Sequence, residues 1–263
     1  MPIRVGVQIQ PQHADFSQMQ KAWREAEYLG VDTIYTWDHF YPLYGDPDGP
    51  HYEGIASLAA LAASTERVRI GGLVFCNSYR NPQLLANAHS SIDNLSGGRV
   101  ILGIGAGWFE RDYDEYGYEF GTAPDRLRAL RRDLPLITQR LGKLKPGPTG
   151  PMPILIGGAG EKVTLRLVAE HAQMWHSFGD LETYERKSEI LAAHCAKVGR
   201  DPASIERVWG SPQNGVGVIE AADGLADAGI SELTIGIGGD GHGYDLGPLK
   251  ELLQWREHYN RTH

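Results

Sequence analysis

Short apolar runs alternate with helix-like patterns along the whole chain, and this alternation limits the fold more than any other feature. The runs are rich in Val, Ile and Leu, which is typical of strands buried on both faces of a parallel sheet. They cover residues 3–9, 31–37, 68–75, 100–102, 153–156, 173–177, 205–210 and 232–236. The helix-like segments follow them at 19–29, 55–64, 84–95, 127–141, 163–170, 184–198, 221–228 and 249–259. The repeat predicts the α/β class and a (β/α)8 TIM barrel, as one domain over 1–263 with short insertions. An open doubly wound sheet is the alternative.

Composition and charge argue against several classes of protein. A net charge of −8 disfavours a nucleic-acid surface, which needs a basic patch. Cys76 and Cys195 form no CxxC motif, so we expect no disulfide scaffold and a reducing compartment. We find no signal-peptide pattern at the start and no apolar stretch of ~18 residues. We therefore expect a cytoplasmic protein that binds neither nucleic acid nor a membrane.

The predicted strand ends share an unusual composition, rich in glycine and aromatic residues and poor in charge. In a barrel of this type, the active site lies at the C-terminal ends of the strands. Those ends are Gln10, Asp38–His39, 73–77, 105–108, 157–160, 175–177 and 236–239. Glycine lets a backbone approach a ligand closely, which suits a large, flat, phosphate-bearing cofactor. The run after residue 103 can also be no more than a tight turn, because its spacing is not Gly-x-Gly-x-x-Gly.

Asp38 and His39 are the main candidates for acid–base chemistry. Histidine titrates near neutral pH, and an aspartate beside it can hold its tautomer and orientation. The alternative is a helix-capping aspartate next to a surface histidine. His171 and His176 have no carboxylate or cysteine at a ligand spacing, so we expect no metal site. A P-loop is also not expected, because Lys162 is not followed by Ser or Thr.

Four segments together resemble the luciferase-like monooxygenase superfamily, and within it the branch that uses the deazaflavin coenzyme F420. They are Trp37-Asp38-His39-Phe40, Tyr79-Arg80-Asn81-Pro82, and residues 96–108 and 153–160. The resemblance runs from residue 3 to about 177 and is looser beyond. It implies a (β/α)8 barrel, a homodimer, and a flavin or deazaflavin at the C-terminal face.

The resemblance also implies roles for single residues. Asp38 would contact the deazaflavin, His39 would transfer a proton, and Cys76 would lie beside the ring. A non-prolyl cis peptide at Leu73–Val74 would support the face of the ring. Phosphate and tail contacts map to Gly107, Ala159, Gly160, Lys162 and Val163. Trp108 and Trp175, at strand ends, are further candidate cofactor contacts. Lys162 and Arg166 are predicted to present positive charge to the tail, helped by Arg80 and Arg111.

Two departures from the family pattern restrict what can be carried over. The F420-dependent glucose-6-phosphate dehydrogenases have a catalytic Glu where this chain has Trp108, which argues against a sugar phosphate. The segment 141–153 is short, so lid contacts do not transfer. We expect an oxidoreductase that moves a hydride between C5 of F420 and an unidentified small organic substrate. The alternatives are an FMN-dependent monooxygenase, a non-catalytic cofactor-binding barrel and a metal hydrolase.

Overall fold

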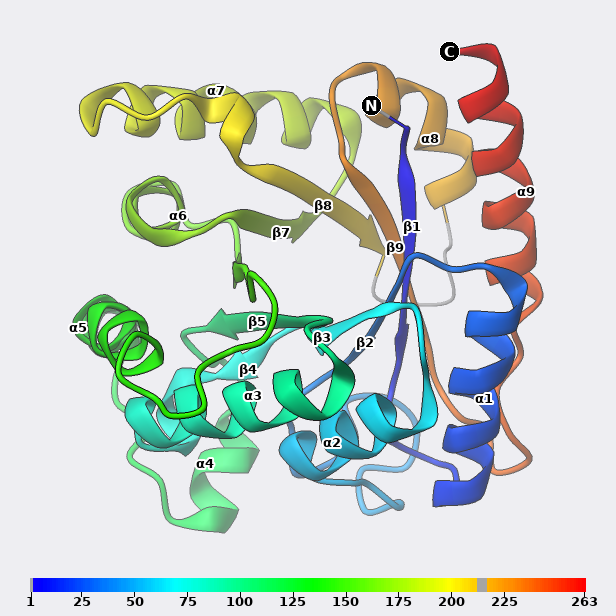
Figure 1. Ribbon diagram of the computed structural model, residues 1–263, viewed down its shortest axis with the longest axis horizontal. Coiled ribbons are helices and arrows are strands. Elements are labelled where there is room, and N and C mark those ends of the chain that lie inside the picture. The colour runs from blue at the N-terminus through cyan, green and yellow to red at the C-terminus, as the bar shows by residue number, and fades with distance from the viewer. Residues whose placement is uncertain (1, 212–216) are drawn as a thin grey trace.

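The computed structural model describes residues 2–211 and 217–263 and contains the predicted barrel (Figure 1). All strand pairs are parallel, and pairing of β3 with β5 closes the sheet into a cylinder. The strands are β1 (Arg4–Ile9), β2 (Thr33–Thr36), β3 (Arg69–Gly72), β4 (Phe75–Cys76), β5 (Val100–Gly105), β6 (Ile154–Gly157), β7 (Met174–Phe178), β8 (Glu206–Ser211) and β9 (Glu232–Ile237). β3 and β4 are two halves of one predicted strand, and both pair with β5. Counted as one strand, they give the barrel eight strands.

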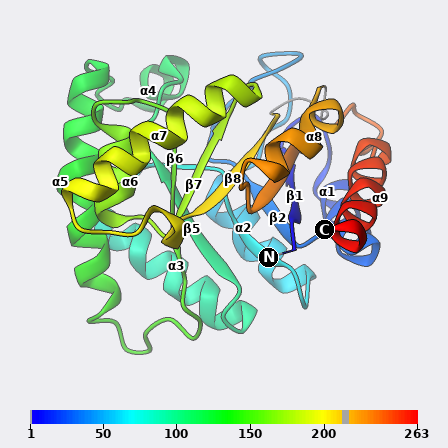
Figure 2. The same cartoon turned by 90° about the horizontal axis from the view of Figure 1, so that it is seen from above.

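The helices form a ring around the strands in the view of Figure 1, and Figure 2 shows the same structure turned by 90°. They are α1 (Phe16–Leu29), α2 (Gly54–Ser64), α3 (Pro82–Ser96), α4 (Glu110–Tyr116), α5 (Ala123–Leu141), α6 (Thr164–His171), α7 (Leu181–Lys197), α8 (Val218–Asp227) and α9 (Gly247–Thr262), with short 3-10 turns η1 (Asn77–Tyr79) and η2 (Pro202–Ser204). Asn260 on α9 bonds both backbone groups of Ile3, which joins the last helix to the first strand. Within the described residues, no helix is long and apolar enough to cross a membrane.

Local sequence signals explain most of the element boundaries. The predicted capping box of Asp15 and Gln18 is confirmed at the start of α1, and Gly30 ends that helix with φ of 91°. α5 begins at Ala123, earlier than the predicted 127, because Thr122 and Asp125 form a second capping box. α4 was not predicted: its seven residues are mostly charged and carry no apolar period.

Successive side chains of each strand face two different cores. On β5, Val100, Leu102 and Ile104 pack against the helices, whereas Ile101 points into the barrel. The barrel interior is filled at that level by Tyr35, Ile101, Leu155, Met174 and Val208. The barrel is therefore a packed core, and only its ends are available for polar chemistry.

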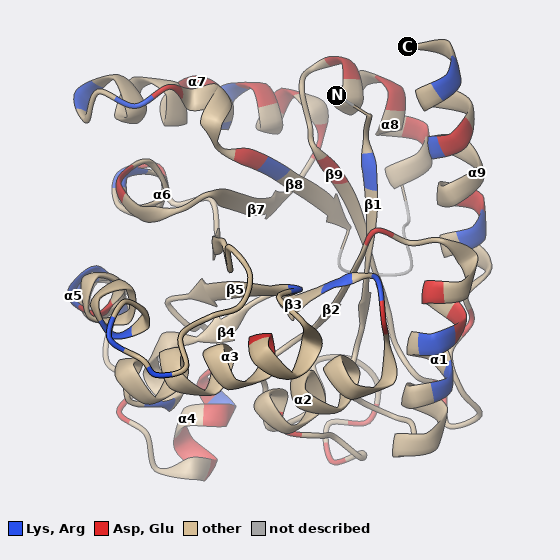
Figure 3. Ribbon diagram, in the orientation of Figure 1, with Lys and Arg blue, Asp and Glu red and all other residues tan. Residues whose placement is uncertain are grey.

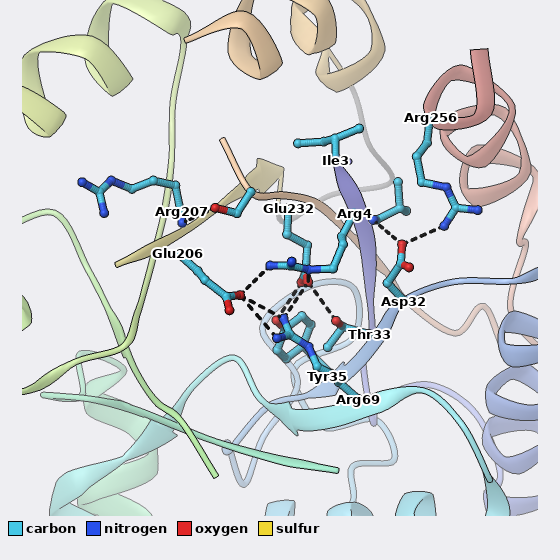
Figure 4. Close-up of polar contacts among 12 residues, drawn as sticks. Ile3, Arg4, Asp32, Thr33, Tyr35, Arg69, Glu206, Arg207, Glu232 and Arg256 are labelled. Atoms are coloured by element: carbon cyan, nitrogen blue, oxygen red, sulfur yellow. Dashed lines mark hydrogen bonds and ion pairs between the residues drawn. The ribbon is translucent and has the colours of Figure 1, made fainter. Parts of the chain in front are cut away.

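A polar cluster closes the N-terminal end of the barrel (Figure 4). Glu232, which is fully buried, accepts hydrogen bonds from the hydroxyls of Thr33 (2.8 Å) and Tyr35 (2.7 Å). It also pairs with Arg69 at 3.1 Å and with Arg4 at 3.5 Å. These charges stand out at the strand starts in Figure 3, where most other charges lie on helices. The contacts at this end stabilise the barrel, because TIM-barrel chemistry takes place at the other end.

Candidate active site

A cavity of about 650 Å³ opens at the C-terminal end of the barrel. Its wall takes side chains or backbone from strands all around the cylinder, from Gln8 on β1 to Thr234 on β9. Seven of the residues proposed for cofactor or catalysis line it: Asp38, His39, Leu73, Val74, Cys76, Gly107 and Trp108. Because these residues all lie at C-terminal strand ends, the barrel brings together positions that are up to 70 residues apart in the chain.

The floor of the cavity is formed where β3 gives way to β4. The peptide bond Leu73–Val74 is cis, which confirms the prediction. Gln8 donates from Nε2 to the carbonyl oxygen of Leu73 at 2.6 Å. A Cβ on Gly105 or Gly157 would lie 2.8 Å from a methyl of Val74. Both strand ends therefore need glycine so that the Val74 side chain fits between them.

Gly107 is required for a different reason. Its φ is +83°, and a Cβ there would lie 2.0 Å from the Tyr113 hydroxyl and 2.6 Å from Cys76 Sγ. Cys76 Sγ and the Tyr113 hydroxyl are themselves 3.2 Å apart. Burial raises the pKa of the Cys76 thiol, so this side chain is a neutral wall of the cavity.

Asp38 is held away from its neighbour His39. Its carboxylate accepts the backbone N–H of Cys76 at 2.9 Å and both guanidinium nitrogens of Arg80, at 2.7 and 2.8 Å. Burial raises the pKa of Asp38, and Arg80 opposes that shift. Asp38 thus ties the end of β2 to the start of α3, and it does not orient His39 as the adjacent positions suggested.

His39 is oriented instead by Asp112, a residue that sequence reasoning missed. His39 Nδ1 lies 2.7 Å from Asp112 Oδ2. Asp112 is fully buried on α4 and also accepts the N–H groups of Phe40 and Tyr41. The only signal in the sequence was an acidic residue shortly after the glycine-rich strand end. Because α4 was not predicted, nothing in the sequence indicated that this residue lies near His39.

The other side chains of the wall are uncharged, and several of them are aromatic. Trp108 and Phe178 remain 63% and 57% exposed at the mouth, and the ring of Trp108 lies edge-on to that of His39. Burial lowers the pKa of His176 to about 4, so its imidazole is neutral at pH 7. Across the parts of the chain that are described, no group of three or more His, Cys, Asp or Glu residues could hold a metal ion.

Comparison with known proteins decides the family. Residues 1–212 match the family described as luciferase-like monooxygenase.

The chain belongs to the luciferase-like monooxygenase family.

Members and structural neighbours show how far the likeness extends. This luciferase-like chain is 35% identical over 116 residues to an F420-dependent glucose-6-phosphate dehydrogenase of Amycolatopsis mediterranei, a match that covers 43% of the chain and 34% of that protein. It thus spans about a third of that relative. It is 27% identical to an uncharacterized protein of Mycobacterium tuberculosis, with 91% of each chain covered. An F420-dependent secondary alcohol dehydrogenase, solved with an F420–acetone adduct, superposes with a TM-score of 0.82 at 16% identity, covering 95% of this chain and 98% of that one.

The remaining residues proposed to bind cofactor in this luciferase-like chain lie outside the cavity wall. Ala159, Gly160, Lys162 and Val163 follow β6 at the rim, beside the wall residues Gly157, Gly158 and Thr164. Trp175 is fully buried on the helix side of β7, where its indole N–H donates to the carbonyl of Gly158 at 2.9 Å. Trp175 therefore supports the rim from behind and does not face the cavity.

The charges predicted for a cofactor tail are mostly committed to other partners. Arg166 pairs with Glu170 at 2.7 Å, Arg111 with Asp48, and Arg80 with Asp38 and Glu53. Lys162 is exposed in the turn before α6, which starts at Thr164, so it does not share a helical face with Arg166. No hydrogen bond or ion pair joins Lys162 to another residue in the described ranges.

Proposed function

We propose that this chain is an F420-dependent oxidoreductase that transfers a hydride between C5 of the deazaflavin and a small organic substrate. The observation that carries the proposal is the cavity at the C-terminal end of the barrel, whose wall brings the apolar side chains of Leu73 and Val74 together with His39, with Gly105 and Gly157 packed against Val74. The glucose-6-phosphate dehydrogenase relative and the alcohol dehydrogenase neighbour, both named as F420-dependent, support the choice of cofactor.

The residues present fit such a group. Leu73, Val74, Cys76 and Gly107 would hold its ring, because they form an uncharged part of the cavity wall at the end of the barrel. The glycine-rich rim after β6 exposes backbone at Gly158 and Gly160, and Gly158 has a φ of +123° that other residues avoid. This rim, at the start of α6, would hold the phosphate.

The cofactor would supply the hydride chemistry when bound, and the chain would supply orientation and a proton. His39 lines the cavity and can hold or deliver a proton at Nε2, because Nδ1 is occupied by Asp112. Trp108 and Phe178 add exposed aromatic surface to the cavity wall, and the ring of Trp108 contacts that of His39.

The substrate is expected to be uncharged. Arg80 and Arg126 bond the wall residues Asp38 and Gly107, and Arg111 is bound by the carbonyl of Pro47. Trp108 stands where the sugar-phosphate enzymes of the family have a catalytic Glu. A phosphorylated substrate would thus find no unpaired positive partner among the described wall residues.

Parallel titrations with F420 and FMN test the proposal. F420 has a longer anionic tail than FMN, so we expect it to bind more tightly. Lys162→Ala is expected to weaken F420 more than FMN, with a loss that shrinks as salt screens the charge. Arg166→Ala is the matched control and should change little, since Glu170 already neutralises that charge.

Other outcomes would replace the proposal. Tighter binding of FMN, with oxidation of the reduced cofactor by O2, would favour a monooxygenase. Tight binding of F420 without turnover of any alcohol, aldehyde, ketone or enone would indicate a non-catalytic cofactor-binding barrel. Hydrolytic activity that depends on an added metal would indicate a metal hydrolase.

A further inference from the structure

We infer that Asp112 is the positioning residue of His39: it holds the proton on Nδ1 and leaves Nε2 as the nitrogen that exchanges a proton in the cavity. The inference rests on the proposed function for its catalytic consequence. The tautomer itself is a property of the chain without cofactor.

Both oxygens of Asp112 are saturated by donors. Oδ1 accepts the backbone N–H of Phe40 at 3.1 Å and of Tyr41 at 3.2 Å. Oδ2 lies 3.0 Å from the Tyr79 hydroxyl and 2.7 Å from His39 Nδ1. A carboxylate in such a setting only accepts, so the nitrogen of His39 that faces it must carry a proton.

The Tyr79 hydroxyl supports this assignment. Burial raises the pKa of Tyr79, and the nearby Cys76 and Asp112 raise it further, so the phenol remains protonated and donates to Oδ2. The rings of Trp37, Trp108 and Phe109 meet the His39 ring at steep angles and restrict its rotation. His39 thus has one partner, one orientation and, in the described structure, no partner at Nε2.

The simpler alternative is that Asp112 only fastens α4 to the segment after β2. Its bonds to two backbone N–H groups serve that purpose without any effect on His39. A test must therefore separate the tautomer of His39 from the stability of the fold.

Asp112→Asn makes that separation. The N–H groups of Phe40 and Tyr41 would keep the amide oxygen at the position of Oδ1, which places the NH2 group where Oδ2 was. The amide then donates to His39 Nδ1, so the neutral imidazole must move its proton to Nε2. Long-range ¹H–¹⁵N spectra of the cofactor-free chain at alkaline pH report which nitrogen is protonated. We expect Nδ1–H in the unmodified chain and Nε2–H in the variant.

Turnover with F420 is the second measurement. We expect kcat to fall by about 100-fold or more in Asp112→Asn, the size of a positioned acid–base contribution, while the F420 Kd changes less than about twofold. Tyr79→Phe removes one donor and keeps the carboxylate, so the Nδ1–H tautomer should persist. Asp93→Asn is the matched structural control: Asp93 is fully buried and accepts three backbone N–H groups, with no histidine bonded to it.

An unchanged tautomer in Asp112→Asn, or a reversed tautomer with kcat retained, would overturn the inference. If Asp112→Asn does not fold, the unmodified chain and Tyr79→Phe still decide, because Nε2–H in either would contradict the role of Asp112. If the unmodified chain shows no turnover with F420, the proposed function fails, and the spectra of the cofactor-free chain still test Asp112 on their own.

Discussion

Glu232 is predicted to contribute far more to stability than Glu206, although both bind the same two arginines. Glu232 is fully buried, and its oxygens accept from Thr33, Tyr35, Arg69 and Arg4. Glu206 pairs with Arg4 at 2.5 Å and with Arg69 at 3.3 Å but is 38% exposed (Figure 4). The substitutions Glu232→Gln and Glu206→Gln keep the volume of the side chain and remove one charge each.

The expected loss in the free energy of unfolding follows from the donors that each substitution leaves without an acceptor. Burial raises the pKa of Tyr35 well above its usual range, and Glu232 raises it further, so its hydroxyl stays a donor that needs an acceptor. In Glu232→Gln, an NH2 group replaces one acceptor oxygen in a site that has donors on every side. Breaking a buried pair costs about 3–5 kcal/mol, and an exposed pair is worth about 0–1 kcal/mol. Arg4 and Arg69 are 28% and 30% exposed, so water relieves part of the cost, and we expect about 3 kcal/mol for Glu232.

Urea unfolding at pH 7, followed by far-ultraviolet circular dichroism, measures both variants. The slope m should stay constant, so that a change in midpoint reports stability alone. F420 binding at low urea should be unchanged, because the cluster lies at the opposite end of the barrel from the cavity. Equal losses in the two variants, or a loss below ~1 kcal/mol in Glu232→Gln, would refute the reasoning.

Three further predictions concern catalysis, acid stability and assembly. His39→Ala should lower kcat by about 10²- to 10⁴-fold with little change in F420 affinity, whereas a loss of affinity alone would remove its catalytic role. Burial lowers the pKa of His89 to about 4 from 6.5, so the folded state disfavours protonation of this histidine. The free energy of unfolding must therefore fall as the pH drops from about 6.5 to 4, and His89→Leu should reduce that fall by about 3 kcal/mol. Identical pH profiles of unfolding for the two proteins would contradict this. We also expect a homodimer by light scattering at micromolar concentration, which Ala63→Glu on the exposed face of α2 should weaken; a monomer for the unmodified chain would contradict it.

The barrel could be predicted because short apolar runs alternate with helical patterns along the whole chain. The residues at the strand ends then follow from topology, and seven of the proposed site residues lie around one cavity as a result. It was harder to predict which side chains at the strand ends face the cavity. Trp175 was proposed as a cofactor contact because it lies at a strand end, but β7 points this side chain toward the helices, where it packs edge-on against Trp209. Position along a strand identifies an end, and a shift of one residue changes the face.

The partner of His39 shows where sequence reasoning fails for a physical reason. Asp38 is the nearest carboxylate in the chain, but extended backbone sends neighbouring side chains in opposite directions, so adjacency makes contact less favourable. Asp38 turns to Arg80, which follows β4, and His39 turns to Asp112, which follows β5. Each pair joins the end of one strand to the segment that follows a different strand. The paired residues are 42 and 73 positions apart in the sequence. An acid–base pair at the end of a barrel is therefore best sought between strand ends, and in this chain that search leads to the short helix α4, whose charged sequence gave no helical period.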